Sequence, residues 1–153
     1  MKQPFYNGMC KTSMPIVSLS CKGISLLFLI DTGSASNHLL APIHDYFKEN
    51  YNDVVKDSKS GQTVTVTGIT GAVECGISKF NFRIGRTDFT DIFLIMPTGT
   101  VLDEFSKQLD APICGILGSQ FLYSNGIILD YGKHCMYSKR RRRKKNDAGR
   151  MSA

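Results

Sequence analysis

The sequence is divided into short runs of apolar and β-branched residues, separated by turns that contain glycine or proline. Residues 16–21 alternate apolar and polar side chains, which is the period of a half-buried strand. Residues 26–30 are continuously apolar and predict a fully buried strand. Further strand-like runs occupy 80–84, 91–96 and 126–131. Short strands at this spacing predict an all-β barrel or sandwich.

A hairpin and short helices complete the predicted fold. The β-branched run 63–67 and the returning segment 72–75 predict a long hairpin with a glycine-bounded tip. Helical patterns are short: 42–50 has proline in its first turn, 100–109 is amphipathic, and a third follows Gly118. We therefore expect a mainly β domain with one or two short helices.

Length and composition indicate one folded domain. The chain has 153 residues, 42% of them hydrophobic, which is enough for one core but not for two. The five cysteines include no C-x-x-C pair, and no histidine lies at metal-ligand spacing, so we expect no zinc site. No signal-peptide pattern or membrane-length apolar run is present. These features predict a cytoplasmic protein without a membrane span.

One acidic residue ends the buried strand predicted over 26–30. Asp31 is followed by Thr32, Gly33 and Ser34, a polar turn that contains glycine. A lone carboxylate is costly to desolvate, so this position indicates either a structural hydrogen-bond network or a site that uses the carboxylate. Taken alone, Asp-Thr-Gly is also an ordinary turn sequence.

Motifs elsewhere in the sequence support a more specific interpretation of this turn. The sequence Phe-Leu-Ile-Asp-Thr-Gly-Ser at 28–34 resembles the active-site turn of aspartic proteases. Ile-Leu-Gly at 116–118 resembles the element that this family places behind the turn, and 127–131 resembles its closing strand. The hairpin 63–75 lies where the family has its flap. Over residues 14–137 the chain is identified as similar to retropepsin-like proteases, which implies a closed β-barrel.

The resemblance implies an endopeptidase that works as a homodimer. In this family a water molecule is activated between two carboxylates that share one proton, because two such close charges cannot both ionise. This chain has one such turn, so the second carboxylate would come from a second copy related by a two-fold axis. Asp31 would be the catalytic carboxylate on each subunit, and no metal or organic cofactor is implied.

The resemblance also implies roles for the neighbouring residues. Thr32 would form hydrogen bonds across the dimer axis, Gly33 would let the backbone approach the dyad, and Ser34 would hydrogen-bond Asp31. The flap tip, consisting of Gly68, Ile69, Thr70 and Gly71, would close over a peptide or protein substrate. Retroviral members are shorter, and the additional segments 42–60 and 99–112 match bacterial members better.

Other polar residues have simpler interpretations. Asp130 precedes a Tyr-Gly-Lys turn and is expected to be structural. His38, His44 and His134 are scattered, so we expect surface or capping positions. Cys114, in an apolar run, is expected to be a buried thiol rather than a nucleophile.

The basic character of the chain belongs to its last segment. Residues 139–153 contain eight Lys and Arg with one Asp, a net charge of +7, whereas residues 1–138 carry a net charge of −1. The unbroken basic run 139–145 predicts a disordered tail, and nucleic acid or an anionic surface is a possible contact. The predicted organisation is an N-terminal segment 1–13, a protease-like domain 14–138 and a basic tail 139–153.

Two alternatives to proteolysis remain open from the sequence. A retropepsin-like domain can serve as a catalytically silent dimerisation or peptide-binding module. A protein of this charge pattern can also act on nucleic acid through its basic tail.

Overall fold

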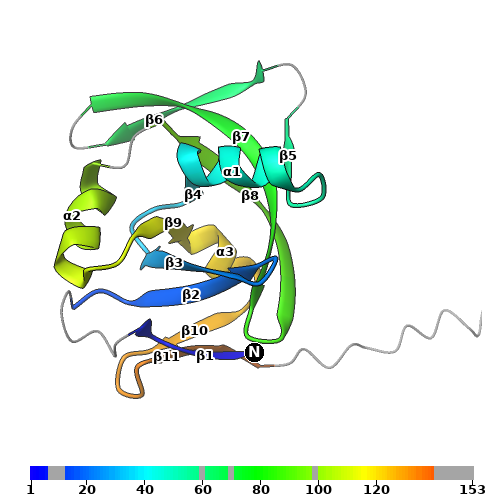
Figure 1. Ribbon diagram of the computed structural model, residues 1–153. Helices are drawn as coiled ribbons and strands as arrows, with labels where there is room; N and C mark the ends of the chain where they lie inside the picture. Colours follow the sequence, from blue (N-terminus) through cyan, green and yellow to red (C-terminus); the bar gives the residue numbers. More distant parts are fainter. Residues whose placement is uncertain (7–12, 59–60, 69–70, 98–99, 140–153) are drawn as a thin grey trace, which may run out of the picture.

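The computed structural model describes residues 1–6, 13–58, 61–68, 71–97 and 100–139 (Figure 1). The secondary structure of this part is mainly strands, with three helices of six to ten residues. The elements in chain order are β1 Lys2–Pro4, β2 Ile16–Cys21, β3 Ile24–Asp31, β4 Asn37–Leu40, α1 Ala41–Asn50, β5 Val55–Asp57, β6 Thr63–Gly68, β7 Gly71–Ile84, β8 Thr87–Met96, α2 Thr100–Leu109, β9 Ile113–Gly118, α3 Ser119–Ser124, β10 Ile127–Asp130 and β11 Cys135–Ser138.

Six strands close into a barrel. The hydrogen-bonded order is β2-β3-β9-β4-β8-β7, and a further pairing between Ser20 and Arg83 joins β7 back to β2. Most neighbouring strands are antiparallel, but β9 runs parallel to β3 and β4 runs parallel to β8. The prediction of a closed, mainly β barrel is confirmed, and the described residues form three short helices where one or two were expected.

The third strand is buried on both faces, as its continuous apolar sequence predicted. Phe28 and Ile30 point into the main core, which is built largely from phenylalanine rings. Leu29, on the opposite face, packs into a second core cluster together with Leu102 and Leu109 of α2. Burial on both faces fixes β3 firmly, and β3 therefore delivers Asp31 to a defined position.

The N-terminal residues belong to a second, smaller sheet that the sequence did not predict. This sheet has the order β1-β11-β10 and lies at the bottom of the view in Figure 1. Lys2 pairs with Tyr137, and the Phe5 side chain is buried in the main core. Because β11 is the central strand, both of its edges are occupied by strands of its own chain, and no strand of the described residues pairs with the outer edge of β10.

Two glycines of β9 let the barrel backbone approach itself closely. A Cβ atom on Gly118 would lie 2.4 Å from the carbonyl oxygen of Ser36 and 2.8 Å from that of Ser34. A Cβ atom on Gly115 would lie 2.2 Å from the carbonyl oxygen of His38. All three distances are far shorter than the contacts that a Cβ atom makes in proteins, so the segment after Asp31 can pack here only against glycine.

Replacing Gly118 tests this close approach. We expect Gly118→Ala to lower the free energy of unfolding by about 1–3 kcal/mol, because the new methyl group must displace backbone rather than a flexible side chain. Gly76→Ala is the control, since its new methyl group would lie 3.9 Å from Ile95 and we expect a change under about 1 kcal/mol. Urea denaturation measures both variants, and equal stabilities would contradict the prediction.

Candidate active site

The turn after β3 is held by its own backbone. The backbone N–H of Gly33 donates a hydrogen bond to Oδ1 of Asp31 at 2.9 Å, and the N–H of Ser34 donates to the Asp31 carbonyl at 3.1 Å. A Cβ on Gly33 would lie 3.2 Å from Oδ1 of Asp31, which is tighter than ordinary contact. This turn therefore presents a carboxylate with one oxygen already bound to a backbone donor.

The start of α3 supports the same turn from behind. Asp31 pairs with Gly118 at the end of β9. The next N–H groups of the chain, those of Ser119 and Gln120, donate to the carbonyl oxygens of Ser34 at 2.7 Å and Ala35 at 3.2 Å. The turn 31–35 and the β9–α3 junction thus form one rigid unit, which agrees with the expected role of the Ile-Leu-Gly element.

Asn37 is a positioning residue that the sequence analysis did not identify. Its side chain is buried, its Oδ1 accepts the N–H of Gly118 at 2.9 Å, and its Nδ2 donates to the Ile92 carbonyl at 3.2 Å. A buried amide with both ends satisfied fixes the strands that it joins. Strand β4, which contains Asn37, was itself not predicted, because its four residues are too few to show a period.

The active-site candidates differ in exposure. Asp31 and Ser34 are half-buried, whereas Thr32 and Gly33 are exposed in the single chain. The Ser34 hydroxyl donates to the Ser36 carbonyl at 2.8 Å, and not to Asp31 as the resemblance implied. Thr32, which the resemblance implies would form hydrogen bonds across a dimer axis, is therefore accessible in the single chain.

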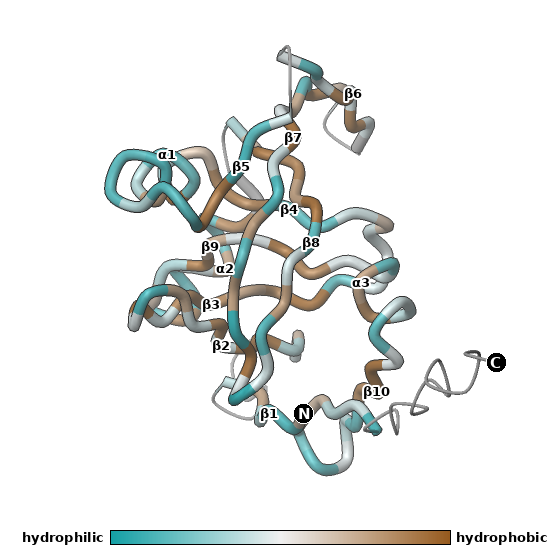
Figure 2. The backbone as a smooth tube through the Cα atoms, turned by 90° about the vertical axis from the view of Figure 1, so that its right-hand side faces the viewer, coloured by the Kyte–Doolittle hydropathy of each residue, from teal (hydrophilic) through white to brown (hydrophobic). Residues whose placement is uncertain are grey.

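The flap candidate is a two-stranded hairpin that projects from the barrel. Within the described part of the chain, strand β6 pairs with β7 alone, in a register that joins Gly68 to Gly71. Figures 1 and 2 show this hairpin at the top of the molecule, beyond the barrel strands. Val64 and Val73 have exposed side chains, and Gly71 has a φ of 119°. The predicted tip residues Ile69 and Thr70 lie outside the described residues.

His38 occupies an unexpected position beside the candidate carboxylate. It pairs with Ile116 of β9, two residues from the Asp31 partner Gly118, so Asp31 and His38 lie on the same face of the sheet. Its side chain is buried, and neither ring nitrogen has a hydrogen-bond partner among the described residues. The expectation of a surface or capping position was wrong for His38. The residue belongs to β4, one of the six strands of the closed barrel, and its side chain is buried there.

Burial determines how this histidine titrates. It lowers the pKa of the His38 imidazole below its ordinary value, and the negative charge of Asp31 opposes the shift only in part. The folded state therefore favours the neutral imidazole of His38 over its protonated form. Because the unfolded chain binds the proton more tightly, stability is expected to fall as the pH drops below about 6.5.

A leucine at position 38 should remove this acid sensitivity. We expect the free energy of unfolding of the native protein to fall between pH 7 and pH 5, by at most about 1.4 kcal/mol per pH unit from one group. In His38→Leu the fall should be smaller by this contribution. Urea denaturation at the two pH values measures it, with the exposed His134 replaced by asparagine as the control. An equal fall in His38→Leu and the native protein would refute the assignment.

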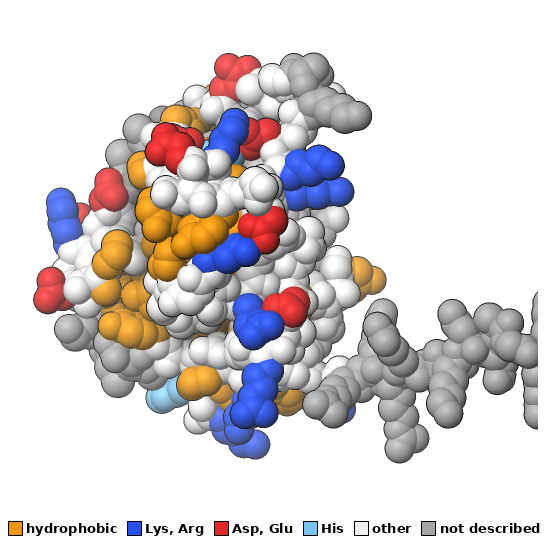
Figure 3. Space-filling model, turned by 45° about the vertical axis from the view of Figure 1, so that its right-hand side comes forward, with side chains coloured by type: hydrophobic (Ala, Val, Ile, Leu, Met, Phe, Trp, Pro, Cys, Tyr) orange, Lys and Arg blue, Asp and Glu red, His pale blue; other side chains and the backbone are white. Residues whose placement is uncertain are grey.

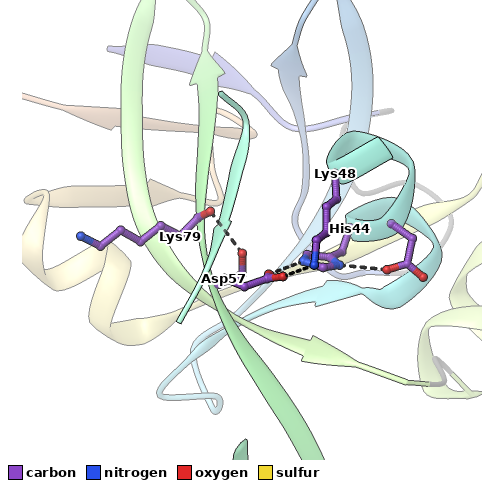
Figure 4. Close-up of polar contacts among 6 residues, drawn as sticks. His44, Lys48, Asp57 and Lys79 are labelled. Carbon is purple, nitrogen blue, oxygen red and sulfur yellow. Dashed lines mark hydrogen bonds and ion pairs between the residues drawn. The ribbon is translucent and has the colours of Figure 1, made fainter. Parts of the chain in front are cut away.

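A second buried histidine joins α1 to β5. Figure 4 shows His44 and Lys48 of α1 directed at Asp57, with distances from His44 Nε2 to Oδ1 of 2.6 Å and from Lys48 Nζ to Oδ2 of 2.5 Å. Burial alone would raise the pKa of Asp57, but the hydrogen bonds from Lys48 and His44 outweigh it and lower that pKa to about 2. His44 was also expected at the surface, and the structure instead gives it a bracing role between two elements.

The remaining polar candidates have structural roles. Oδ1 of Asp130 accepts the N–H of Lys133 at 2.8 Å, which confirms it as a turn residue. Cys114 is a buried free thiol, as expected, and burial raises its pKa. Within the described ranges, no three His, Cys, Asp or Glu side chains gather as a metal site. No helix in that part of the chain is long and apolar enough to cross a membrane.

Solved structures of other proteins share this architecture, although no match is found at the level of sequence. No protein-family model matches the sequence, and no curated protein matches it. Among solved structures, the EIAV protease in complex with the inhibitor HBY-793 matches with a TM-score of 0.52 at 17% identity, covering 74% of this chain and 88% of the viral one. The retroviral protease-like domain of Ddi1 from Leishmania major matches with a TM-score of 0.54 at 10% identity, covering 83% of this chain and 89% of that domain.

The chain therefore has the retropepsin-like fold. Both structural neighbours are matched over most of their length, and the closed barrel is built from the elements that the resemblance implied. At 17% and 10% identity the likeness shows the fold alone, and the catalytic chemistry depends on the residues of this chain.

Proposed function

We propose that this protein is an aspartic endopeptidase whose active site forms between two copies of the chain. Each copy supplies Asp31, and the two carboxylates share one proton and activate a water molecule that attacks the peptide carbonyl. One carboxylate takes a proton from the water and the other donates a proton to the departing amine. The bond is hydrolysed without a covalent intermediate.

The observation that carries this proposal is the construction of the Asp31 turn. Its carboxylate is half-buried, and one of its oxygens accepts the Gly33 N–H, so the other oxygen is left for a water molecule or a proton. The turn is buttressed from behind by Gly118 and α3. Rigid placement of a carboxylate is what general acid–base catalysis requires, since reactivity depends on position to within a fraction of an ångström.

A neutral isostere of the aspartate tests the mechanism. We expect Asp31→Asn to reduce kcat/KM for peptide cleavage by at least about 10²-fold, because the amide can neither accept nor deliver the proton. Asp110→Asn is the matched control, as it removes an exposed carboxylate from the turn after α2 and should leave cleavage intact. Cleavage should be inhibited by pepstatin and be fastest at mildly acidic pH, where the dyad holds one proton.

The result of that experiment separates the alternatives. Cleavage that survives in Asp31→Asn would contradict the paired-aspartate mechanism. A dimeric native protein that cleaves no peptide between pH 4 and pH 7 would favour the silent peptide-binding module instead.

The proposal requires a dimer, and two features support one. Thr32 and Gly33 are exposed in the single chain, beside the carboxylate that needs a partner. The free edge of β10 carries the exposed Ile128, and Tyr123, in the preceding helix α3, is 89% exposed. Large apolar side chains at an unpaired strand edge mark a surface suited to another chain. We place the subunit contact on α3 and β10 as well as on the Asp31 turn.

Charged residues at this surface should weaken the dimer. We expect the double variant Tyr123→Lys and Ile128→Lys to raise the dimer dissociation constant at least about tenfold, because two buried contacts are lost and like charges meet across the axis. Sedimentation equilibrium measures the constant. Tyr46→Lys, on the exposed face of α1, is the control and should not change it. An unchanged constant in the double variant would place the interface elsewhere.

A further inference from the structure

A basic hollow lies where the small sheet meets the barrel. It has a volume of about 860 Å³ and is bordered by β1, the β7–β8 turn, the end of α3 and the end of β11. Its cationic residues are Lys2, Arg86 and Lys139, and no Asp or Glu is among the described residues that line it. Figure 3 shows Lys and Arg side chains gathered on the lower part of the face turned toward the viewer.

The fold brings these three charges together from distant parts of the sequence. Lys2 of β1 pairs with Tyr137 of β11, and Lys139 comes directly after that strand. The β7–β8 turn lies against the same place, because a Cβ on Gly85 would be 3.7 Å from the Lys2 carbonyl oxygen. Arg86 is the next residue of that turn. The hollow is therefore a product of strand pairing and not of one basic segment.

The three cations are exposed and are not neutralised by the described part of the chain. None of them forms an ion pair with another described residue. The acidic residue nearest to Arg86 in sequence, Asp88, is bound by Arg83 at 2.8 Å. Unpaired cations around a concave surface create a positive potential, which a bound anion would offset.

The side chains of the hollow favour a phosphate group among the possible anions. Arg86 carries a planar guanidinium that can bind two phosphate oxygens at once, and Lys2 and Lys139 supply point charges. The Ser124 hydroxyl and the Asn125 amide are neutral donors in the same lining. A phosphate monoester presents three acceptor oxygens and a charge of about −2 at neutral pH, whereas a carboxylate presents two oxygens and a single charge. Three cations with neutral donors beside them match the phosphate better.

We propose that this hollow binds a compact phosphate group that carries two or more negative charges, as on a phosphorylated small molecule. Its volume lies in the range of about 300–1,000 Å³ that is usual for small-molecule sites. The half-buried Phe89 in the wall offers an apolar contact to the rest of such a ligand. The described lining includes no residue of the Asp31 turn, so this proposal does not depend on proteolysis.

Pyrophosphate is the probe that tests the hollow. It is titrated into the full chain by isothermal calorimetry, in a buffer free of divalent cations. The variant Lys2→Gln with Arg86→Gln removes two charges from the hollow. Lys56→Gln with Lys107→Gln is the matched control, because it removes the same charge from exposed positions on β5 and α2. All three proteins keep the sequence 139–153, so any binding by that segment is common to them.

The expected result is a loss of affinity that is confined to the hollow variant. It should bind pyrophosphate at least about tenfold more weakly than the native protein, because two charge-assisted contacts are lost. The control should bind like the native protein. Pyrophosphate should also raise the thermal midpoint of the native protein and the control more than that of the hollow variant, since binding to the folded state stabilises it. Citrate, a compact tricarboxylate, should bind the native protein more weakly than pyrophosphate.

Three outcomes would overturn the proposal. Equal affinity of the hollow variant and the native protein would mean that the hollow takes no part in binding. Equal losses in the hollow variant and the control would mean that only net charge matters. Citrate binding as tight as that of pyrophosphate would refute the assignment of a phosphate group.

A second titration distinguishes a soluble ligand from a lipid headgroup, since both can carry this group. Phosphatidylcholine vesicles that contain phosphatidic acid present a phosphate monoester at a membrane surface. Vesicle binding that is weakened in the hollow variant and not in the control would assign the phosphate to a lipid. Pyrophosphate binding without such an effect on vesicles would support a soluble ligand, and binding of neither probe would refute the site.

Discussion

The close contact between β9 and the segment after Asp31 is the constraint on which the rest of the structure depends. At Gly115 and Gly118 the backbone of β9 approaches the carbonyl oxygens of residues 34–38 more closely than any side chain would allow. This contact completes the barrel between β3 and β4, and it also aligns α3 behind the turn. One packing interaction therefore shapes the fold and positions the carboxylate, so that stability and the geometry of the candidate site cannot be varied separately.

Two neighbouring polar residues of β4 are both buried, but they differ in whether their side chains have hydrogen-bond partners. The Asn37 amide is satisfied at both ends and ties β9 to β8. The next residue, His38, is equally buried without a partner for either nitrogen among the described residues. A buried polar group without a hydrogen bond lowers the free energy of unfolding by roughly 1–3 kcal/mol, so His38 is present at the expense of stability. Its place on the same sheet face as Asp31 links that cost to the region where the proposed chemistry takes place.

The elements that were predicted from the sequence and those that were missed differ in length and in the sequence range of their contacts. Strands β2 and β3, the hairpin at 63–75 and helix α1 have enough residues to show a period or a turn signal, and all were predicted. Strands β1 and β4 have three and four residues, and each is a strand only because distant segments provide its hydrogen bonds. The burial of His38 and His44 was missed for the same reason, since it depends on which elements lie around them.

The sequence by itself determined the mainly β class and the presence of a single Asp-Thr-Gly turn at the end of a buried strand. These follow from local periodicity and from counting, which require no coordinates. Only the tertiary structure decided that β11 is enclosed by strands of its own chain, that His38 lies beside Asp31, and that Lys2, Arg86 and Lys139 surround one hollow. The physical reason is that such neighbourhoods arise from strand pairing between distant segments, and pairing depends on how the whole core closes.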